Sequence, residues 1–152
     1  MVDRFEAGFD ARGYGLWAVE RVDTGEFIGF TGLTPMIEGI PGSGGVEIGW
    51  RLARAHWRQG FATEAAEAAL EFAFVSAQID EVHSVTAAVN EPSRRVMRRI
   101  GMRHIDDFAY PGIDEASPLR PHVRYRIGRE GWAALRQAQG VKAACSSSGS
   151  GR

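Results

Sequence analysis

The sequence is poor in cysteine: Cys145 is the only one among 152 residues, and it lies in a Ser/Gly-rich C-terminal segment. A single cysteine cannot form an internal disulfide, and no metal-ligand neighbourhood surrounds it, so the sequence predicts neither a disulfide nor a metal site. The lack of disulfides is typical of a reducing compartment.

Long apolar runs are also missing. No segment approaches the roughly 20 apolar residues that a membrane-spanning helix needs. The N-terminal segment, MVDRFEAGFDARG, is charged and lacks the apolar core of a secretory signal. We therefore expect a cytoplasmic protein with no membrane partner.

Neither sign of charge is in excess. The chain carries 18 Lys and Arg against 19 Asp and Glu, a formal net charge of −1, which gives no bulk attraction to nucleic acid. The segment RRVMRR, residues 94–99, could suggest an RNA-binding helix face. No aromatic residues alternate with these arginines to stack on bases, so a solvated helix face explains them better. We expect no nucleic-acid partner.

The rest of the composition suits one folded domain, with 44% hydrophobic and 24% charged residues. Apolar periodicity and turn residues predict strands at residues 15–20, 26–33, 46–52, 81–89, 102–108 and 122–127, and helices at 1–12, 62–77, 90–100 and 129–139. A hairpin followed by alternating strands and helices predicts an α/β (α+β) fold, with one central, mixed and mostly antiparallel sheet flanked by helices. We place this domain at residues 1–140 and a flexible Ser/Gly tail at residues 141–152.

The segment WRLARAHWRQGFATEAA, from Trp50 to Ala66, is where we expect a phosphate to bind. A predicted strand ends, a short basic loop follows, and a helix begins just after Gly60. The first turn of a helix has unpaired backbone N–H groups and a partial positive charge, and a glycine lets a phosphate approach closely. Gly60 alone could equally be a turn residue before a core helix. The sequence contains neither G-x-x-x-x-G-K-[ST] nor G-x-G-x-x-G, which argues against an NTPase or a Rossmann enzyme.

Three separated segments resemble the GNAT N-acetyltransferases, and within them the RimJ/RimL-type branch. They are VEIGWRLARAHWRQGFATEAAEAALEFAF, the N-x-x-S start of the next helix, and the IGM that follows that helix. The family pattern of Gln or Arg, two residues, Gly, one residue, then Gly or Ala falls on Trp57, Gly60 and Ala62. An aromatic residue at the first of these positions is similar to the RimJ/RimL branch. The resemblance implies acetyl-CoA as cosubstrate and transfer of the acetyl group to a primary amine, by direct attack on the thioester.

The resemblance also implies which residues hold acetyl-CoA. The end of the strand would pair through its backbone with the pantetheine arm, at Trp50, Arg51 and Leu52. Backbone N–H groups would bind the pyrophosphate, from Arg58, Gln59, Gly60, Phe61, Ala62 and Thr63. Asn90 would hydrogen-bond to the pantetheine, although asparagine is also a good helix N-cap and could serve the helix alone. Ser93, one helical turn further, could contact the CoA sulfur or be only a first-turn residue.

The residue that would protonate the leaving thiolate is not where the family usually has it. Many members carry a tyrosine seven residues after the asparagine, and here that position is Met97, which cannot donate a proton. Ser93 is then the nearest hydroxyl candidate for a catalytic acid. The thiolate could also leave without a protein acid, because a thiol pKa of about 8.5 makes it a fair leaving group.

The attacking amine must be neutral, so a catalytic base or a water relay to one is useful. Glu47 is the first candidate because it lies on the strand that leads to the cofactor loop; an exposed carboxylate or an ion pair with Arg51 is its alternative explanation. The further candidates are Asp106, Asp107 and His122. Tyr110 stands where relatives often have histidine, and its role is open.

Two functions remain open from the sequence. The first is an active N-acetyltransferase whose acceptor is a protein N-terminus or a small-molecule amine, with the acidic candidates hinting at a cationic acceptor. The second is a catalytically impaired acyl-CoA-binding or interaction module, favoured by Met97. By resemblance the chain begins inside the last helix of the family's N-terminal region, and an edge strand would be missing. A homodimer could cover such an edge.

Overall fold

The computed structural model describes the backbone of residues 9–147 and the side chains up to residue 140. Residues 9–12 are helical, in agreement with the predicted N-terminal helix. The earlier part of that helix, including Phe5, lies outside the described residues. The Phe9 ring packs against Trp17, with the ring centroids 5.1 Å apart, so the end of the helix is attached to the first strand.

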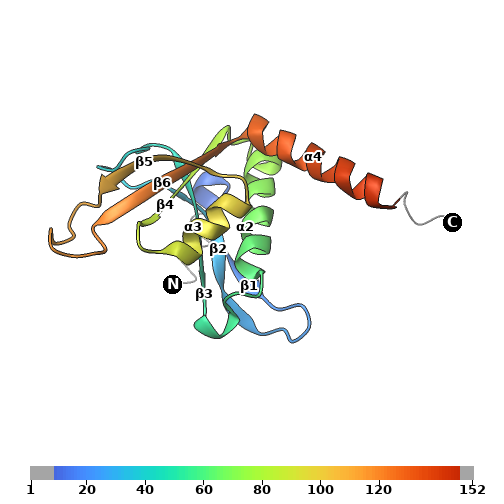
Figure 1. Cartoon of the computed structure of the whole chain (residues 1–152), viewed down its shortest axis with the longest axis horizontal. Coiled ribbons are helices and arrows are strands. Elements are labelled where there is room, and N and C mark those ends of the chain that lie inside the picture. The colour runs from blue at the N-terminus through green and yellow to red at the C-terminus, as the bar shows by residue number, and fades with distance from the viewer. Residues whose placement is uncertain (1–8, 148–152) are drawn as a thin grey trace.

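A mixed six-stranded sheet forms the centre of the molecule (Figure 1). Its strands are β1 (Leu16–Glu20), β2 (Phe27–Pro35), β3 (Val46–Leu52), β4 (Glu81–Ala87), β5 (Arg103–Ala109) and β6 (Pro121–Gly128). Their spatial order is β1-β2-β3-β4-β6-β5, and every neighbouring pair is antiparallel except β3 and β4. The predicted fold class is therefore confirmed.

Helices α2 (Phe61–Glu71) and α3 (Glu91–Arg99) pack on one face of the sheet, and a π-helical turn, Phe72–Ser76, extends α2. The alternation predicted for β3 is confirmed, because Ile48 and Leu52 are buried beneath these helices. The buried face of α2 is built mainly of alanines, which let the helix approach the sheet closely. Met97 on α3 is also buried, at 1% exposure, so this side chain is part of the core.

Helix α4 (Arg129–Ser147) projects away from the sheet (Figure 1). The sequence predicted that it would end at Gln139, and this end was wrong. Alanine and lysine in the stretch VKAAC are good helix formers, and one interior glycine, Gly140, costs only about 1 kcal/mol relative to alanine. The helix thus continues into the segment that we assigned to the tail, while residues 148–152 lie outside the described residues. The domain boundary at residue 140 stays a prediction.

Candidate cofactor and acetyl-transfer site

The parallel strands β3 and β4 are paired only at their beginning. Val46 pairs with Val82 and Glu47 pairs with His83, and no later residues of the two strands are paired with each other. Because β3 continues to Leu52 and β4 to Ala87, the strands part over the rest of their length. The backbone of β3 beyond Ile48 therefore borders a gap in the sheet, which we call the strand gap.

The backbone N–H and C=O groups of every second residue of β3 point towards the strand gap. The N–H of Ala53 bonds to Ile28 on β2 at 2.9 Å, and Arg51 pairs with Phe30. Since alternate residues of a strand direct their polar groups to the same side, Arg51 is turned towards β2. Trp50 and Leu52 are turned towards the gap. A main-chain contact from the end of this strand would thus come from Trp50 and Leu52.

Two side chains satisfy the polar backbone where the strands separate. The Ser84 hydroxyl donates to the Ile48 carbonyl at 3.0 Å, and both groups are buried. The Glu47 carboxylate lies near the backbone N–H of Val85 on β4. These contacts replace the missing backbone ladder at the closed end of the gap, and they position an acidic side chain inside it.

Glu47 is half-buried, and this burial raises the pKa of its carboxyl to about 6, with a smaller opposing effect of the Val85 N–H. Among the described residues no ion pair joins Glu47 to Arg51, which is exposed. A carboxyl with this pKa is mostly ionised at about pH 7 and is a stronger base than an exposed glutamate. Glu47 therefore has the position and the protonation behaviour expected of a general base.

The loop between β3 and α2 is fixed by Trp57 and His56. The Trp57 indole Nε1 donates to the Leu52 carbonyl at 2.8 Å, and the Arg54 guanidinium lies over the indole ring at 5.6 Å. His56, buried in the short 3-10 turn Arg54–His56, has its Nε2 3.3 Å from Glu26 Oε1 in the β1–β2 hairpin. The sequence analysis missed the His56–Glu26 contact, because no local pattern joins residues so far apart in the chain.

The backbone around Gly60 fits a bound phosphate. Arg58 and Gly60 both have left-handed φ angles, 60° and 85°, and such turns direct neighbouring N–H groups to one side. Within the described part of the chain, the N–H groups of residues 60–63 have no hydrogen-bond acceptor. A Cβ built at Gly60 would meet no atom within 4 Å, so this glycine faces open space. The pyrophosphate of acetyl-CoA could occupy that space.

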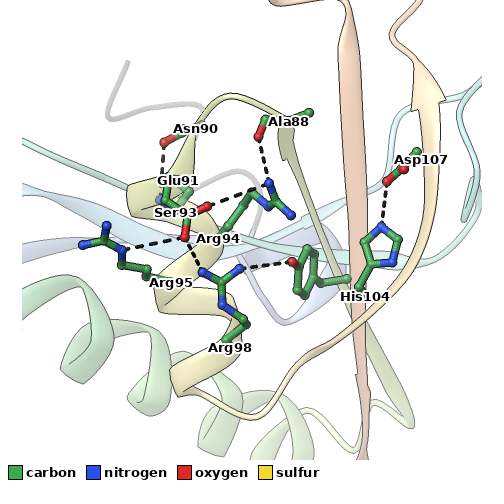
Figure 2. Close-up of polar contacts among 10 residues, drawn as sticks. Ala88, Asn90, Glu91, Ser93, Arg94, Arg95, Arg98, His104 and Asp107 are labelled. Atoms are coloured by element: carbon green, nitrogen blue, oxygen red, sulfur yellow. Dashed lines mark hydrogen bonds and ion pairs between the residues drawn. The ribbon is translucent and has the colours of Figure 1, made fainter.

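The start of α3 forms the other side of the candidate site (Figure 2). Asn90 is the N-cap predicted from the sequence: its Oδ1 accepts from the Ser93 N–H at 3.3 Å, and its Nδ2 donates to Thr86 Oγ1 at 3.0 Å. An amide can make further hydrogen bonds beyond these two, so a contact with pantetheine stays compatible with capping. The Ser93 hydroxyl has no hydrogen bond to any described residue and could donate to a ligand.

Three of the four arginines of α3 are held by one carboxylate. Glu91 forms ion pairs with Arg94, Arg95 and Arg98, and Arg98 also reaches the Tyr125 hydroxyl at 3.5 Å (Figure 2). These interactions hold the pKa of Glu91 below its usual value, mainly through the hydrogen bond from Arg98. Arg94, Arg95 and Arg98 are therefore ion-paired on this helix face, and the absence of a nucleic-acid partner stays a prediction.

The other candidate bases do not border the strand gap directly. The Arg124 side chain holds Asp106 through two hydrogen bonds, of 3.0 and 2.6 Å, and these lower the pKa of Asp106. Asp107 lies on the helix side of the sheet, 2.7 Å from His104 (Figure 2). On the opposite side, His122 has its Nδ1 3.3 Å from the Arg120 carbonyl. Of the four candidates, only Glu47 borders the gap.

Comparisons with known proteins agree with this geometry. The family described as "Acetyltransferase (GNAT) domain" matches residues 1–103. The protein YkkB of Bacillus subtilis is 39% identical over 95 residues, covering 61% of this chain and 54% of YkkB. The FsC-acetyl coenzyme A-N(2)-transacetylase of Aspergillus fumigatus is 33% identical over 139 residues, covering 82% of this chain and 54% of its own length. A GNAT-family acetyltransferase structure from Bordetella pertussis superposes with a TM-score of 0.71 at 28% identity, covering 82% of this chain and 72% of that chain.

The chain belongs to the GNAT acetyltransferase domain family, because the family match covers more than half of its residues. It spans about half the length of the curated relatives named above. None of the helices described in the structure is long and apolar enough to cross a membrane. The described residues also contain no group of three or more His, Cys, Asp or Glu side chains arranged to hold a metal ion.

Proposed function

We propose that this protein is an acetyl-CoA-dependent N-acetyltransferase that acts on a primary amine. One observation carries the proposal. The gap between the parallel strands β3 and β4 lies next to the first turns of α2 and α3, which have backbone or side-chain groups free to hydrogen-bond a ligand, and the half-buried Glu47 borders that gap. Unpaired N–H groups at a helix start suit a pyrophosphate. A strand edge without a neighbouring strand suits an extended arm that carries amide groups, such as pantetheine, although the Leu52 carbonyl on this edge already accepts from Trp57.

Each part of the cofactor would meet a different part of the chain. The N–H groups of residues 58–63 would bind the pyrophosphate, with the exposed Arg51 and Arg58 adding positive charge. Trp50 and Leu52 would pair with the pantetheine arm from one side of the gap, and the Asn90 amide would contact it from the other. Bound acetyl-CoA would supply the thioester carbonyl that the amine attacks.

Two side chains of the protein would act in proton transfer and in stabilising the leaving group. Glu47 would take a proton from the amine, directly or through a water, since its pKa near 6 leaves it ionised yet basic. Ser93 would donate a hydrogen bond to the leaving sulfur, because its hydroxyl has no other described partner and it lies in the first turn of α3.

Calorimetry with the purified chain tests the cofactor site. We expect acetyl-CoA and desulfo-CoA to bind and free adenosine to bind far more weakly, because the main contacts are to the pyrophosphate. Gly60→Glu should abolish binding, since it places bulk and negative charge where the pyrophosphate would lie. The far-ultraviolet circular dichroism should stay native. Full acetyl-CoA binding by a folded Gly60→Glu variant would contradict the site.

A second candidate function is acyl-CoA binding without catalysis. The buried Met97 favours it, because this side chain occupies the position where the family often has a proton-donating tyrosine. The two functions differ in turnover. Acetyl-CoA binding with no acetylation of any amine in a broad panel would favour the binding module.

The RimJ/RimL-type branch is part of the same proposal. It is supported by the aromatic residue at position 57, whose indole bond to Leu52 gives a structural reason for an aromatic donor there. The homodimer and the cytoplasmic location stay predictions. Light scattering of the purified chain tests the first of them.

A further inference from the structure

Three aromatic rings stand together at the paired ends of β5 and β6. The Tyr110 and His122 rings have centroids 4.4 Å apart, and Phe108 lies 5.8 Å from His122 and 6.3 Å from Tyr110. All three side chains are half-buried, so part of each ring surface faces solvent. We call Phe108, Tyr110 and His122 the aromatic wall.

The aromatic wall lies on the face of the sheet opposite α2 and α3. Val123 and Tyr125 on β6 are buried in the core beneath the helices. Because side chains of a strand alternate between faces, His122 points to the other face. Phe108 pairs with His122 in the ladder and shares that face. Helices α2 and α3 cover one face of the described structure, while on the other face the β2–β3 loop lies beside His83 and Arg124. An amine would reach the strand gap from this second face, between that loop and the wall.

The wall is close to the strand gap. His122 pairs with Ala87 on β4, two residues beyond Val85, whose N–H lies near the Glu47 carboxylate. Two residues of a strand span about 7 Å and neighbouring strands lie about 5 Å apart, so the backbones of Val85 and His122 are about 8.5 Å apart. An acceptor whose nitrogen lay beside Glu47 could therefore place a ring on His122 and Tyr110 if only a short linker joined the two groups.

The carboxylates near the wall already have partners. Asp106 is held by Arg124 through two hydrogen bonds, and Glu115 lies 3.3 Å from Arg120. Asp114 accepts a hydrogen bond from the backbone N–H of Ala116 at 2.8 Å. The wall thus offers ring faces beside two carboxylates that arginines neutralise, Asp106 and Glu115, while Asp114 keeps its charge. Such a surface suits an aromatic body carrying one amine better than it suits a polyamine.

We propose, building on the acetyltransferase function above, that the acceptor is an arylalkylamine whose ring packs on the aromatic wall while its nitrogen lies beside Glu47. The neutral amine nitrogen forms the new C–N amide bond as the thioester C–S bond breaks. One amine proton passes to Glu47, and CoA leaves as the thiolate. Tyr110, Phe108 and His122 set the specificity, and Glu47 is the base.

Binding, rather than turnover, is the first test. Phenethylamine, hexylamine and spermidine are titrated into the full chain, with and without desulfo-CoA, while the His122 ring C–H resonances are followed by NMR. We expect phenethylamine to bind about three- to tenfold more tightly than hexylamine, as one aromatic pair predicts, and to shift the His122 resonances by ring current. Equal or tighter binding of hexylamine or spermidine would overturn the proposal.

Variants distinguish an effect of the aromatic wall on amine binding from an effect on folding. Tyr110→Leu should weaken phenethylamine binding about three- to tenfold, whereas Tyr110→Phe should stay within about twofold because the ring is kept. Phe27→Leu, an exposed aromatic on β2, is the matched control and should leave binding unchanged. Phe108→Leu is the second variant if Tyr110→Leu does not fold. Unchanged phenethylamine binding in the folded wall variants would refute the assignment.

Turnover distinguishes the two proposals. If phenethylamine is acetylated, Tyr110→Leu should raise its KM with little change in kcat. Acetylation of hexylamine or spermidine with a higher kcat/KM than phenethylamine would sink the arylalkylamine proposal and leave the acetyltransferase intact. If no CoA derivative binds, the proposed function fails. The titration of phenethylamine into the chain without CoA then still tests whether the aromatic wall binds a ring.

Discussion

The indole Nε1 of Trp57 donates a 2.8 Å hydrogen bond to the carbonyl of Leu52, joining the cofactor loop to the end of β3. The bond holds together two parts of the candidate site, the strand edge that would pair with pantetheine and the turn that would bind the pyrophosphate. Trp57 is 46% exposed as a residue, so burial alone does not fix the position of its indole ring. The hydrogen bond gives the tryptophan a defined role in the site.

Trp57→Phe keeps an aromatic side chain and removes the indole N–H donor. We expect acetyl-CoA binding to weaken about fivefold, in line with about 1 kcal/mol for one hydrogen bond, as measured by calorimetry. Trp132→Phe is the matched control, because Trp132 is a half-buried tryptophan of α4 whose ring packs against Phe74 of the core. If Trp57→Phe bound acetyl-CoA as tightly as the unmodified chain, the indole bond would have no part in ordering the site.

Glu47→Gln tests the general base through the pH dependence of turnover. With Glu47 present, kcat should fall as the pH drops through about 6, because a protonated carboxyl cannot accept the amine proton. The variant should lose about a hundredfold in kcat and should lack this acidic limb. Glu38→Gln, in the loop between β2 and β3, is the control. If the pH profile of kcat for Glu47→Gln kept the same acidic limb, the general base would be another residue.

Glu47 should also affect stability independently of catalysis. Its pKa is raised in the folded chain, so the stabilising contribution of the protonated carboxyl is complete below about pH 4.5 and is lost as the pH rises through about 6. Between these limits the unfolding free energy of the native chain should fall relative to Glu47→Gln, by at most about 2 kcal/mol. Urea titrations of both proteins at several pH values measure this difference, and parallel pH curves would mean that Glu47 is exposed.

Two glycine-to-alanine changes should act in opposite directions. Gly60 has a φ of 85°, so Gly60→Ala should cost about 1 kcal/mol through backbone strain, although a Cβ there would meet no atom. Gly131 lies in α4, also with open space at its Cβ, and Gly131→Ala should stabilise the helix by about 0.5–1 kcal/mol. Thermal unfolding compares the two. A stabilising Gly60→Ala would show that the turn before α2 does not hold this conformation.

Ser93→Ala removes the candidate acid and keeps the backbone N–H that Asn90 caps. If the hydroxyl assists the leaving sulfur, kcat should fall about tenfold or more while the acetyl-CoA dissociation constant changes less than about twofold. Steady-state kinetics and calorimetry on the same sample separate the two effects. An unchanged kcat would remove Ser93 from the mechanism and favour departure of the thiolate without a protein acid.

Much of the fold could be predicted because its signals are local. Strand β3 has the predicted bounds, since strict alternation over Val46–Leu52 specifies one buried face. Asn90 and Gly101 mark the start and end of α3 through capping and a left-handed φ of 90°. The end of α4 could not be predicted in the same way, because helix propensity falls only gradually at its C-terminal end.

The candidate bases show where sequence reasoning stopped. A register shift between His104 and Asp106 in β5 moves His104 onto the same face as Asp107, and Asp106 onto the face of Arg124. Nothing local in the stretch RHIDDFA specifies this bulge. Glu47, the first candidate base, and Asp106 and Asp107, the further candidates, therefore lie in three different environments, and both aspartates are already paired.

The sequence by itself determined the order of strands and helices, the glycine turn before α2 and the cap of α3, because each depends on residues within a few positions of one another. Only the tertiary structure decided that β3 and β4 separate after one short paired stretch, that Glu47 is half-buried at that gap, and that Phe108, Tyr110 and His122 meet on the face opposite α2 and α3. These features arise from contacts between segments far apart in the chain. Burial and strand register exist only once those segments have packed together.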